Sequence, residues 1–381
     1  MKSRLNFTAV EIITKLQRGG AQLTTLEINR HFSNSFLITG KGGELFEEAK
    51  QHLNERLIIA PHLYREINFY YDIKALVEII EILTCLKRHY RNLIVHTNSS
   101  KAGILGRLAA RLLHLPVFHT VHGWSFNPCQ HKIFQWLIIH GERLLAKYTR
   151  KIIVVTKEDI GKGLNCKIGE FNQYEVIRAV VPLEQYQNCS GLKIRTELNI
   201  QSDNPVIGSV AVFKPQKAPF DFVQAAAEVV KQCPRAEFII AGGGPMLNPA
   251  RELAEKLNIR DKIHFLGWRK DIPEVINALD IFILTSLWEG LPQVILQAMM
   301  ASKPVIANAV DGSKEVVVHG VNGYLVPPGC PHLIAQKIIE LINNPSKRNE
   351  MGKRGKAGIY PEFSLERMLN KITVVFQDLA Y

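Results

Sequence analysis

The stretch SLWEGLPQVILQAMMASKPVIA, residues 286–307, places Glu289 and Gly290 between an apolar run and a proline. The run before it, DIFILTS (280–286), has the composition of a buried strand, and the residues after Pro292 have helical spacing. Proline is favoured at the first helical position because its missing N–H would be unpaired there anyway. We therefore expect a strand, a tight turn and then a helix that opens at Pro292.

The start of that expected helix suits a phosphate. Gln293, Val294 and Ile295 would present free backbone N–H groups, and the helix dipole favours negative charge there. Gly290 allows close approach of the backbone to a ligand. Glu289 cannot bind a phosphate, but its carboxylate can accept hydrogen bonds from sugar hydroxyls. The alternative is a plain strand–turn–helix in which Glu289 is only a charge near the helix N-terminus.

Short apolar runs alternate with helix-length segments along the whole chain. Such runs, separated by helices, are typical of a parallel sheet covered on both faces. The expected strands are 9–16, 35–40, 92–98, 116–123 and 151–157, then 205–213, 236–242, 262–268, 280–286 and 303–309. The pattern breaks within 179–193, which marks a linker. Because 381 residues exceed one ordinary core, we expect an α/β chain of two doubly wound, Rossmann-like domains that face each other across a cleft, with ligands at the carboxyl ends of the strands.

Composition excludes several classes of protein. No apolar run reaches the ~18–20 residues that span a bilayer, and the first 20 residues lack the pattern of a signal peptide. Six cysteines without a Cys-x-x-Cys pair favour a reducing cytoplasm and argue against a disulfide framework or a zinc site. A net charge of +12 can attract anionic lipid or phosphorylated substrates, or can reflect only a solvated basic surface. No basic block with interleaved aromatic residues indicates nucleic-acid binding.

Two segments, 67–91 and 129–151, mix apolar and basic residues at helical spacing. Each could lie on a membrane surface, but the favoured interpretation is a core helix with one solvated face. The last segment, 363–381, is also expected to be a helix.

Residues 286–329 resemble the donor-binding segment of the family-four retaining glycosyltransferases, which have the GT-B fold. That segment combines Glu-Gly-x-Pro, a second Glu eight residues after the first, Ala-Met-Ala, Pro-Val-Val-Ala, Gly...Glu and Asn-Gly. The resemblance extends over nearly the whole chain through ITKLQRGGAQ (13–22), HTNSSKAGILGRLAARLLHLPVFHTVHG (96–123), VAVFKPQKAP (210–219) and AGGGP (241–245). It implies an acceptor-binding domain at 1–182, a donor-binding domain at 183–355, and a helix within 356–381 that packs back across the cleft.

The resemblance also assigns donor-site residues. The first Glu of the pair holds hydroxyls of the donor sugar and corresponds to Glu289. The second Glu holds the ribose hydroxyls, but here it is Gln297, which lacks the charge assistance of a carboxylate and predicts weaker nucleotide binding. The family lysine at the donor phosphates corresponds to Lys217. The family arginine five residues earlier is Val212 here; Lys214 lies nearby but is not a bidentate fork.

Two glycine turns complete the implied donor site. Gly19 and Gly20 end the first expected strand and precede a helix, and their backbone would approach the donor diphosphate; the alternative is a plain turn. In the turn FLGW, residues 265–268, backbone groups around Gly267 would contact the base. Trp268 is interpreted as a packing residue.

His122, in HTVHGW (119–124), matches the family histidine near the reacting sugar, where it hydrogen-bonds a hydroxyl or the acceptor. The alternative is a strand-end histidine with ordinary partners. The spacing of His119 and His122 could suggest a metal, but no third ligand is nearby, so no metal is expected.

The resemblance thus implies a retaining transfer of sugar from a nucleotide sugar, such as a UDP- or GDP-sugar, to a glycan or polyprenyl-linked acceptor in surface polysaccharide or lipopolysaccharide biosynthesis. It needs no cofactor. The expected partners are the donor, the acceptor and an anionic membrane surface, with no nucleic acid, and the expected location is the cytoplasm, peripheral at the inner face of the membrane. One alternative is a degenerate member that binds a nucleotide sugar or a partner with little transfer, motivated by Val212 and Gln297. The other is a dinucleotide-dependent oxidoreductase, against which Leu247 argues because a G-x-G-x-x-G fingerprint needs glycine there.

Overall fold

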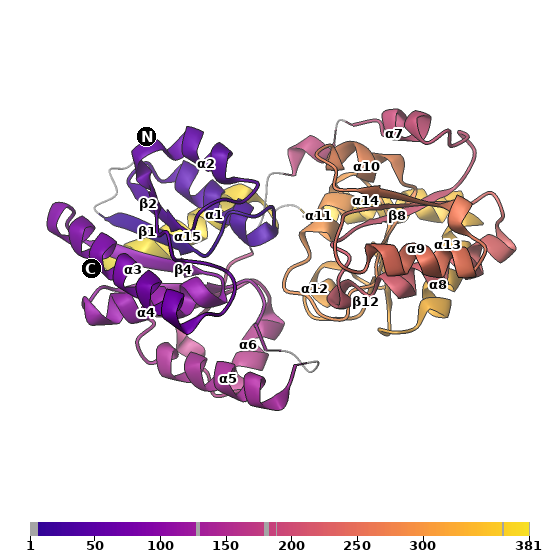
Figure 1. The fold of residues 1–381 in the computed structure, drawn as a ribbon. Helices are drawn as coiled ribbons and strands as arrows, with labels where there is room; N and C mark the ends of the chain where they lie inside the picture. The colour runs from indigo at the N-terminus through magenta and orange to yellow at the C-terminus, as the bar shows by residue number, and fades with distance from the viewer. Residues whose placement is uncertain (1–6, 127–129, 179–182, 188, 360–361, 381) are drawn as a thin grey trace. The chain divides into compact units, whose positions relative to one another are not determined.

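The chain folds into two compact α/β units, seen in a computed structural model that describes residues 7–126, 130–178, 183–187, 189–359 and 362–380. Unit 1 comprises residues 1–181 and 365–381, and unit 2 comprises residues 182–364. Each unit is a parallel sheet with helices on both faces (Figure 1). Part of the expected linker, 179–182, lies outside the described residues.

Among its described residues, unit 1 has a sheet of order β3-β2-β1-β4-β5-β6-β7. Its strands are β1 (Thr8–Ile13), β2 (Ser35–Thr39), β3 (Leu57–Ile59), β4 (Leu93–Asn98), β5 (Val117–Val121), β6 (Lys151–Val154) and β7 (Tyr174–Val176). Its helices are α1 (Gly20–His31), α2 (Phe46–Leu53), α3 (Phe69–His89), α4 (Ser100–Leu112), α5 (Lys132–Ala146), α6 (Lys157–Asn165) and α15 (Leu365–Ala380).

Within the described part of unit 2, the sheet has the order β10-β9-β8-β11-β12-β13. Its strands are β8 (Val206–Val210), β9 (Glu237–Ala241), β10 (Ile263–Gly267), β11 (Ile281–Leu284), β12 (Val305–Asn308) and β13 (Gly323–Val326). Its helices are α7 (Leu192–Glu197), α8 (Pro219–Gln232), α9 (Leu247–Lys256), α10 (Ile272–Ala278), α11 (Gln293–Met300), α12 (Ser313–Val316), α13 (Pro331–Ile342) and α14 (Pro345–Ile359).

All ten expected strands are present, so the doubly wound α/β prediction is confirmed. The sequence interpretation missed β3, β7 and β13. Each of them is only three or four residues long and lies at the edge of its sheet. Short edge strands lack the continuous apolar run that marks a buried strand.

Unit 1 includes the last helix of the chain. The buried side of α15 packs against residues of β1, β4 and β5, and Phe376 contacts the ring of Phe118. Helices α3 and α4 cover the opposite face of the same sheet (Figure 1). The boundary expected between residues 355 and 356 falls inside α14 of unit 2, and the chain returns to unit 1 at Leu365.

The two ambiguous helices differ. Helix α3 buries Ala75, Ile79, Leu83 and Leu86, so the prediction of a core helix with one solvated face is confirmed for 67–91. Helix α5 buries only Glu142, Leu145 and Ala146, and it exposes five large apolar side chains, Ile133, Phe134, Trp136, Leu137 and Leu144. The core-helix interpretation of 129–151 is therefore wrong for its described residues, because α5 leaves most of its large apolar side chains exposed.

A buried ion pair joins α4 to α5. Arg107 donates to both carboxylate oxygens of Glu142, at 2.9 and 2.8 Å, and the two side chains are almost completely excluded from solvent. Burial of either charge alone would cost several kcal/mol, so each group depends on the other.

We expect Arg107→Met to lower the free energy of unfolding of unit 1 by about 3–5 kcal/mol, because it leaves the Glu142 carboxylate buried without a cation. The double variant Arg107→Met with Glu142→Leu removes both charges and should recover most of that loss. Urea unfolding followed by circular dichroism measures the three proteins. A double variant as unstable as the single one would contradict this account.

Candidate functional site

Two neighbouring loops of unit 2 meet where the winding of its sheet reverses. Strand β8 lies between β9 and β11, and the loops that follow β8 and β11 leave the same edge of the sheet. Ligands of doubly wound sheets bind at this reversal, at the carboxyl ends of the strands. The loop after β8 carries Lys214 and a short helical turn, Pro215–Lys217, and the loop after β11 carries Glu289 and Gly290.

Hydrogen bonds hold these two loops together. The Gln216 side chain donates to the carbonyl of Trp288 at 2.7 Å, and the backbone N–H of Leu287 donates to the carbonyl of Gln216 at 2.8 Å. The Thr285 hydroxyl donates to the carbonyl of Lys217 at 2.7 Å. The two segments that the sequence analysis assigned to one donor site are therefore joined into one surface.

Lys217 and Glu289 form an ion pair on this surface. Their side chains are only 16% and 9% exposed, so solvent screens the pair weakly. The backbone N–H of Glu289 donates to the Asp311 carboxylate at 2.9 Å, and this bond fixes the backbone from which the glutamate side chain extends. Sequence reasoning missed Asp311; its signal was the Asp-Gly turn dipeptide at 311–312.

The start of α11 differs in detail from the expectation. Pro292 precedes the first helical residue and is the N-cap. Its carbonyl accepts a hydrogen bond from the backbone N–H of Ile295 at 3.0 Å, so the prediction of a free N–H at Ile295 is wrong. Gln293 and Val294 carry the first two backbone N–H groups of the helix. One turn further on, Gln297 is 9% exposed.

Glycines shape the neighbouring wall of unit 2. Gly242 and Gly244 have φ of +140° and +144°, and a Cβ atom at either would clash with a backbone carbonyl, that of Ala211 or of Phe213. These two positions therefore require glycine. Gly267, at the end of β10, has φ of +65° and open space around it. Trp268 was interpreted as a packing residue, but it is 63% exposed, with one edge of its indole ring against Gly243.

The glycine pair of unit 1 begins a helix and does not end a strand. Strand β1 stops at Ile13, Gly19 is the N-cap of α1, and Gly20 is its first residue. The expectation that the pair ends the first strand is therefore wrong. Gly19 has an extended backbone, with φ of −166°, and the nearest obstacle to a Cβ atom there is the flexible side chain of Gln22.

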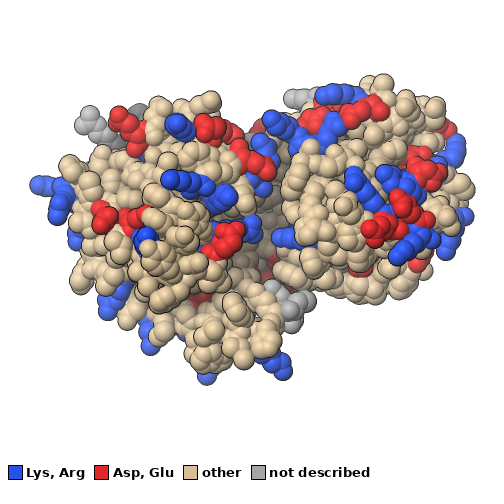
Figure 2. Space-filling view, in the orientation of Figure 1, with Lys and Arg blue, Asp and Glu red and all other residues tan. Residues whose placement is uncertain are grey.

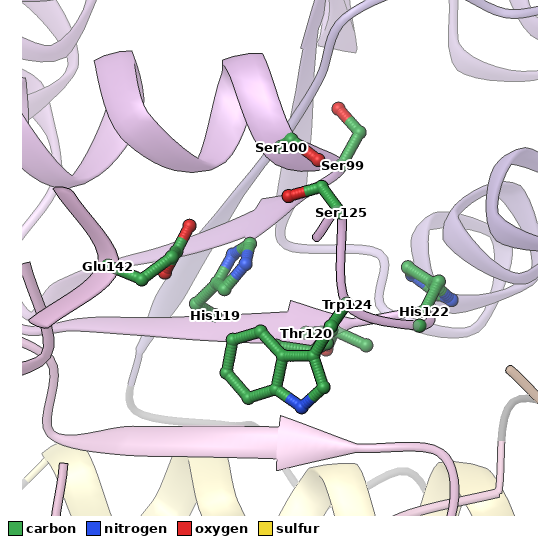
Figure 3. Close-up of a pocket in the computed structure, with 10 residues that line it drawn as sticks. Ser99, Ser100, His119, Thr120, His122, Trp124, Ser125 and Glu142 are labelled. Carbon is green, nitrogen blue, oxygen red and sulfur yellow. The ribbon is translucent and has the colours of Figure 1, made fainter. Parts of the chain in front are cut away.

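His122 follows β5, next to the point where the sheet of unit 1 reverses between β1 and β4. Its Nε2 lies 3.0 Å from Oδ1 of Asn98, at the end of β4. It also lines a small cavity of about 50 Å³, together with Ser99, Ser100, His119, Thr120, Val121, Gly123, Trp124, Ser125 and Glu142. Figure 3 shows His122 at the end of the strand, on the opposite side of this cavity from Glu142.

Both histidines near the cavity are neutral at physiological pH. Burial lowers the pKa of His122 to about 3, with a further contribution from the charge of His96. Burial, followed by the charge of Arg107, holds the pKa of His119 well below its usual range. Nδ1 of His119 lies 2.9 Å from the Thr97 hydroxyl and 3.0 Å from the Thr97 carbonyl. Among the described residues, no group of three His, Cys, Asp or Glu side chains is placed to hold a metal ion.

Sequence comparison matches each half of the chain to a family of glycosyltransferases. Residues 18–161 match the family model Glycosyltransferase Family 4, and residues 192–358 match Glycosyl transferases group 1. The UDP-Gal:alpha-D-GlcNAc-diphosphoundecaprenol alpha-1,3-galactosyltransferase of Escherichia coli is 30% identical over 380 residues, which cover 97% of this chain and 95% of that one. The chain belongs to the family 4, group 1 glycosyltransferases.

This glycosyltransferase also resembles the capsular polysaccharide biosynthesis glycosyltransferase CapM of Staphylococcus aureus, with 25% identity over 325 residues and 84% of each chain covered. Family and relatives make it an enzyme that uses a nucleotide-sugar donor, and the oxidoreductase alternative is dropped.

Solved structures confirm the GT-B fold of the glycosyltransferase. Anabaena Alr3699/HepE in complex with UDP and glucose has a TM-score of 0.85 at 20% identity, covering 98% of this chain and 100% of that one. WaaG, a glycosyltransferase involved in lipopolysaccharide biosynthesis, has a TM-score of 0.74 at 14% identity, covering 97% and 99%. No helix within the described residues combines the length and apolar content needed to cross a membrane.

The low pKa of His122 should make this glycosyltransferase sensitive to acid. The folded-state pKa of about 3 lies below the ordinary value of 6.5, so only the unfolded chain binds this proton near pH 5. Stability is therefore complete above about pH 6.5 and falls as the pH falls toward 3. The free energy of unfolding falls in the wild type when the pH is lowered from 7 to 5. In His122→Gln this fall should be smaller by about 1–2 kcal/mol.

Urea unfolding at the two pH values measures the difference. The matched control is His89→Gln, which makes the same substitution at an exposed histidine on α3. Equal acid sensitivity of His122→Gln and the wild type would contradict the low pKa.

Proposed function

We propose that this glycosyltransferase transfers a sugar from a UDP-sugar to a glycan or polyprenyl-linked acceptor in surface polysaccharide biosynthesis, with retention of anomeric configuration. The main support is the near-full-length similarity to the Escherichia coli enzyme, whose name specifies UDP-galactose and a diphosphoundecaprenol acceptor. The HepE structures, which contain UDP, UDP with glucose, or UDP-glucose, agree with a uridine donor.

The chemistry of unit 2 fits the donor. In our proposal the diphosphate lies at the start of α11, where the backbone N–H groups of Gln293 and Val294 and the helix dipole attract an anion. Lys217 supplies the positive charge that stabilises the departing nucleoside diphosphate. Glu289 accepts hydrogen bonds from hydroxyls of the donor sugar, and Gln297 contacts the ribose without the charge assistance of a carboxylate.

The Lys217–Glu289 ion pair gives donor binding a specific electrostatic consequence. Without ligand, the two charges neutralise each other in a weakly screened position. A bound diphosphate competes with Glu289 for the ammonium group of Lys217. The Glu289 carboxylate can then accept hydrogen bonds from the sugar hydroxyls. The pair therefore favours a ligand that carries both an anion and a sugar over a free nucleoside diphosphate.

In unit 1, we assign His122 to a sugar hydroxyl. A neutral imidazole accepts a hydrogen bond and cannot act as a strong acid. Sugar transfer with retention needs no protein nucleophile if the acceptor attacks from the face that the diphosphate leaves. The positive charge of Lys217 then supplies the main electrostatic stabilisation of the step.

The donor proposal is tested by titration calorimetry with UDP and GDP, and by UDP release from UDP-galactose in the presence of GlcNAc-diphosphoundecaprenol. We expect UDP to bind, and Gln297→Glu to bind it roughly 5–30-fold more tightly, because a charged acceptor for a diol adds about 1–2 kcal/mol. Lys217→Met should lower kcat roughly 100-fold or more, the typical effect of removing one electrostatic stabiliser.

Lys193→Met is the matched control. Lys193 is also an ion-paired lysine of unit 2, with Asp271 at 3.4 Å, but it belongs to α7 and not to the two loops that carry Lys217 and Glu289. It should retain transfer activity. Absence of binding by either diphosphate would overturn the donor site. Binding without transfer or hydrolysis of any UDP-sugar would instead favour the degenerate alternative.

We further propose that the exposed side of α5 attaches the enzyme to an anionic membrane, where a polyprenyl-linked acceptor resides. The apolar residues Ile133, Phe134, Trp136, Leu137 and Leu144 are each more than half exposed. The single acidic residue of α5, Glu142, is buried in its ion pair with Arg107. An apolar helix face without exposed acids suits the interface of anionic lipids.

Basic residues border this face. Arg111 of α4 lies over the ring of Tyr148, 3.9 Å from its centroid, and Lys132 and Lys147 stand at the two ends of α5. Figure 2 shows the surface over α5, at the bottom of the picture, as mostly uncharged with lysine and arginine at its margins. Each basic residue near an anionic surface contributes about 1 kcal/mol of attraction.

Co-sedimentation with vesicles tests this attachment. We expect binding to phosphatidylglycerol vesicles but weak binding to phosphatidylcholine vesicles, and at least a roughly 10-fold loss in Leu137→Glu, because the exposed leucine that would enter the lipid is replaced by a charge. Leu192→Glu makes the same change at a leucine of unit 2 that is also more than half exposed, and it should bind as the wild type does. Equal losses in both variants would overturn the assignment to α5.

A further inference from the structure

A carboxylate lies in the middle of the sheet of unit 1. Glu11, on the inner strand β1, is 0% exposed. Its two oxygens accept hydrogen bonds from Nδ1 of His96 at 2.7 Å and from Nδ2 of Asn98 at 2.8 Å. An apolar residue of similar size is often more stabilising at such a position than a buried charged group. The position of Glu11 therefore points to a role other than stability.

The strand register explains how Glu11 connects to the end of the sheet. Glu11 lies opposite His96 in the β1–β4 ladder, and Asn98 follows two residues later on the same face. His122, beyond the end of β5, continues this row through its 3.0 Å contact with Asn98. The row thus runs from the core to the carboxyl edge of the sheet, where ligands of doubly wound domains bind.

Asn98 determines which nitrogen of His122 carries the proton. An amide side chain donates through Nδ2 and accepts through Oδ1. Because Nδ2 donates to Oε2 of Glu11, Oδ1 faces His122 as an acceptor. The Nε2 of His122 must then carry a hydrogen, and Nδ1 is left as the acceptor of a neutral ring.

Aromatic rings protect this row from water. The ring of His96 stacks on Phe118 with centroids 4.1 Å apart, and Phe376 of α15 packs edge-on against Phe118 at 4.9 Å. Nε2 of His96 lies 2.7 Å from the hydroxyl of Thr120. Both ring nitrogens of His96 are thus occupied, and the carboxylate keeps a fixed orientation.

We propose that Glu11, acting through Asn98, holds His122 in the Nε2–H tautomer with Nδ1 as a hydrogen-bond acceptor. Glu11 and Asn98 are then positioning residues, since neither needs to touch the sugar. The tautomer itself follows from contacts within unit 1. Only its importance for catalysis rests on the proposed role of His122 in sugar transfer.

The tautomer is measured directly on the full chain. In protein labelled with ¹⁵N-histidine, protonated and bare ring nitrogens have distinct chemical shifts, and His122→Gln identifies the signals of His122. We expect one neutral form in the wild type, with the proton on Nε2, unchanged from pH 5 to pH 8. An Nδ1–H form or a mixture of tautomers would overturn the inference.

Asn98→Ala should release the ring into both tautomers and lower kcat roughly 10–100-fold, as small misplacements of a catalytic group do, with KM for the donor nearly unchanged. Thr97→Val is the matched control, because Thr97 is equally buried on β4 but faces His119 on the opposite side of the sheet. It should keep the His122 tautomer and most of kcat. An unchanged tautomer in Asn98→Ala would overturn the inference.

Glu11→Gln is a second variant of nearly unchanged shape. Its amide accepts on one side only, so either His96 or Asn98 must reverse its hydrogen bond, and the proton must move on His96 or His122. If neither histidine changes, the inference fails. A tautomer change in Asn98→Ala with unchanged kcat would leave the positioning intact and would overturn the role of His122 in the proposed function.

Discussion

The two sheets reverse their direction of winding, between β1 and β4 in unit 1 and between β8 and β11 in unit 2. At each reversal, the connections after two adjacent strands leave toward opposite faces, so the strand ends between them stay uncovered. Polar side chains can gather there without breaking the apolar core. Lys217 and Glu289 occupy one such place, and Asn98, next to His122, occupies the other.

Buried charge is handled in two ways within unit 1. Glu142 is paired with a full cation, and this pair ties one helix to another. Glu11 instead accepts hydrogen bonds from a histidine, His96, and an amide, Asn98. The bond to Asn98 fixes how that amide faces the next side chain in the row. The ion pair links helix α4 to helix α5. The row of hydrogen bonds from Glu11 through Asn98 instead determines which ring nitrogen of His122 carries the proton.

Much of the fold was predictable because strands buried on both faces need long apolar runs, and the ten runs in the sequence became ten strands. The edge strands β3, β7 and β13 were missed because each is only three or four residues long. Glu289 and Lys217 were also predictable, since each follows a recognisable strand, but their ion pair depends on how two loops lie against each other. Glu11 could not be recognised, because a single glutamate in AVEIITKL gives no sign of its partners on β4. The exposure of α5 was missed because helical spacing does not tell which neighbours cover a helix.

The position of α15 has a consequence for biosynthesis. The first 181 residues contribute seven strands to the described part of their sheet, yet Phe376 and its neighbours on α15 complete the core beneath them. During translation, α15 is made only after residues 182–364, which takes roughly 10–40 s at about 5–20 residues per second. Throughout that interval the part of this sheet face that α15 later covers lacks its helix. The unit that begins the chain is therefore completed only after all of unit 2 has been made.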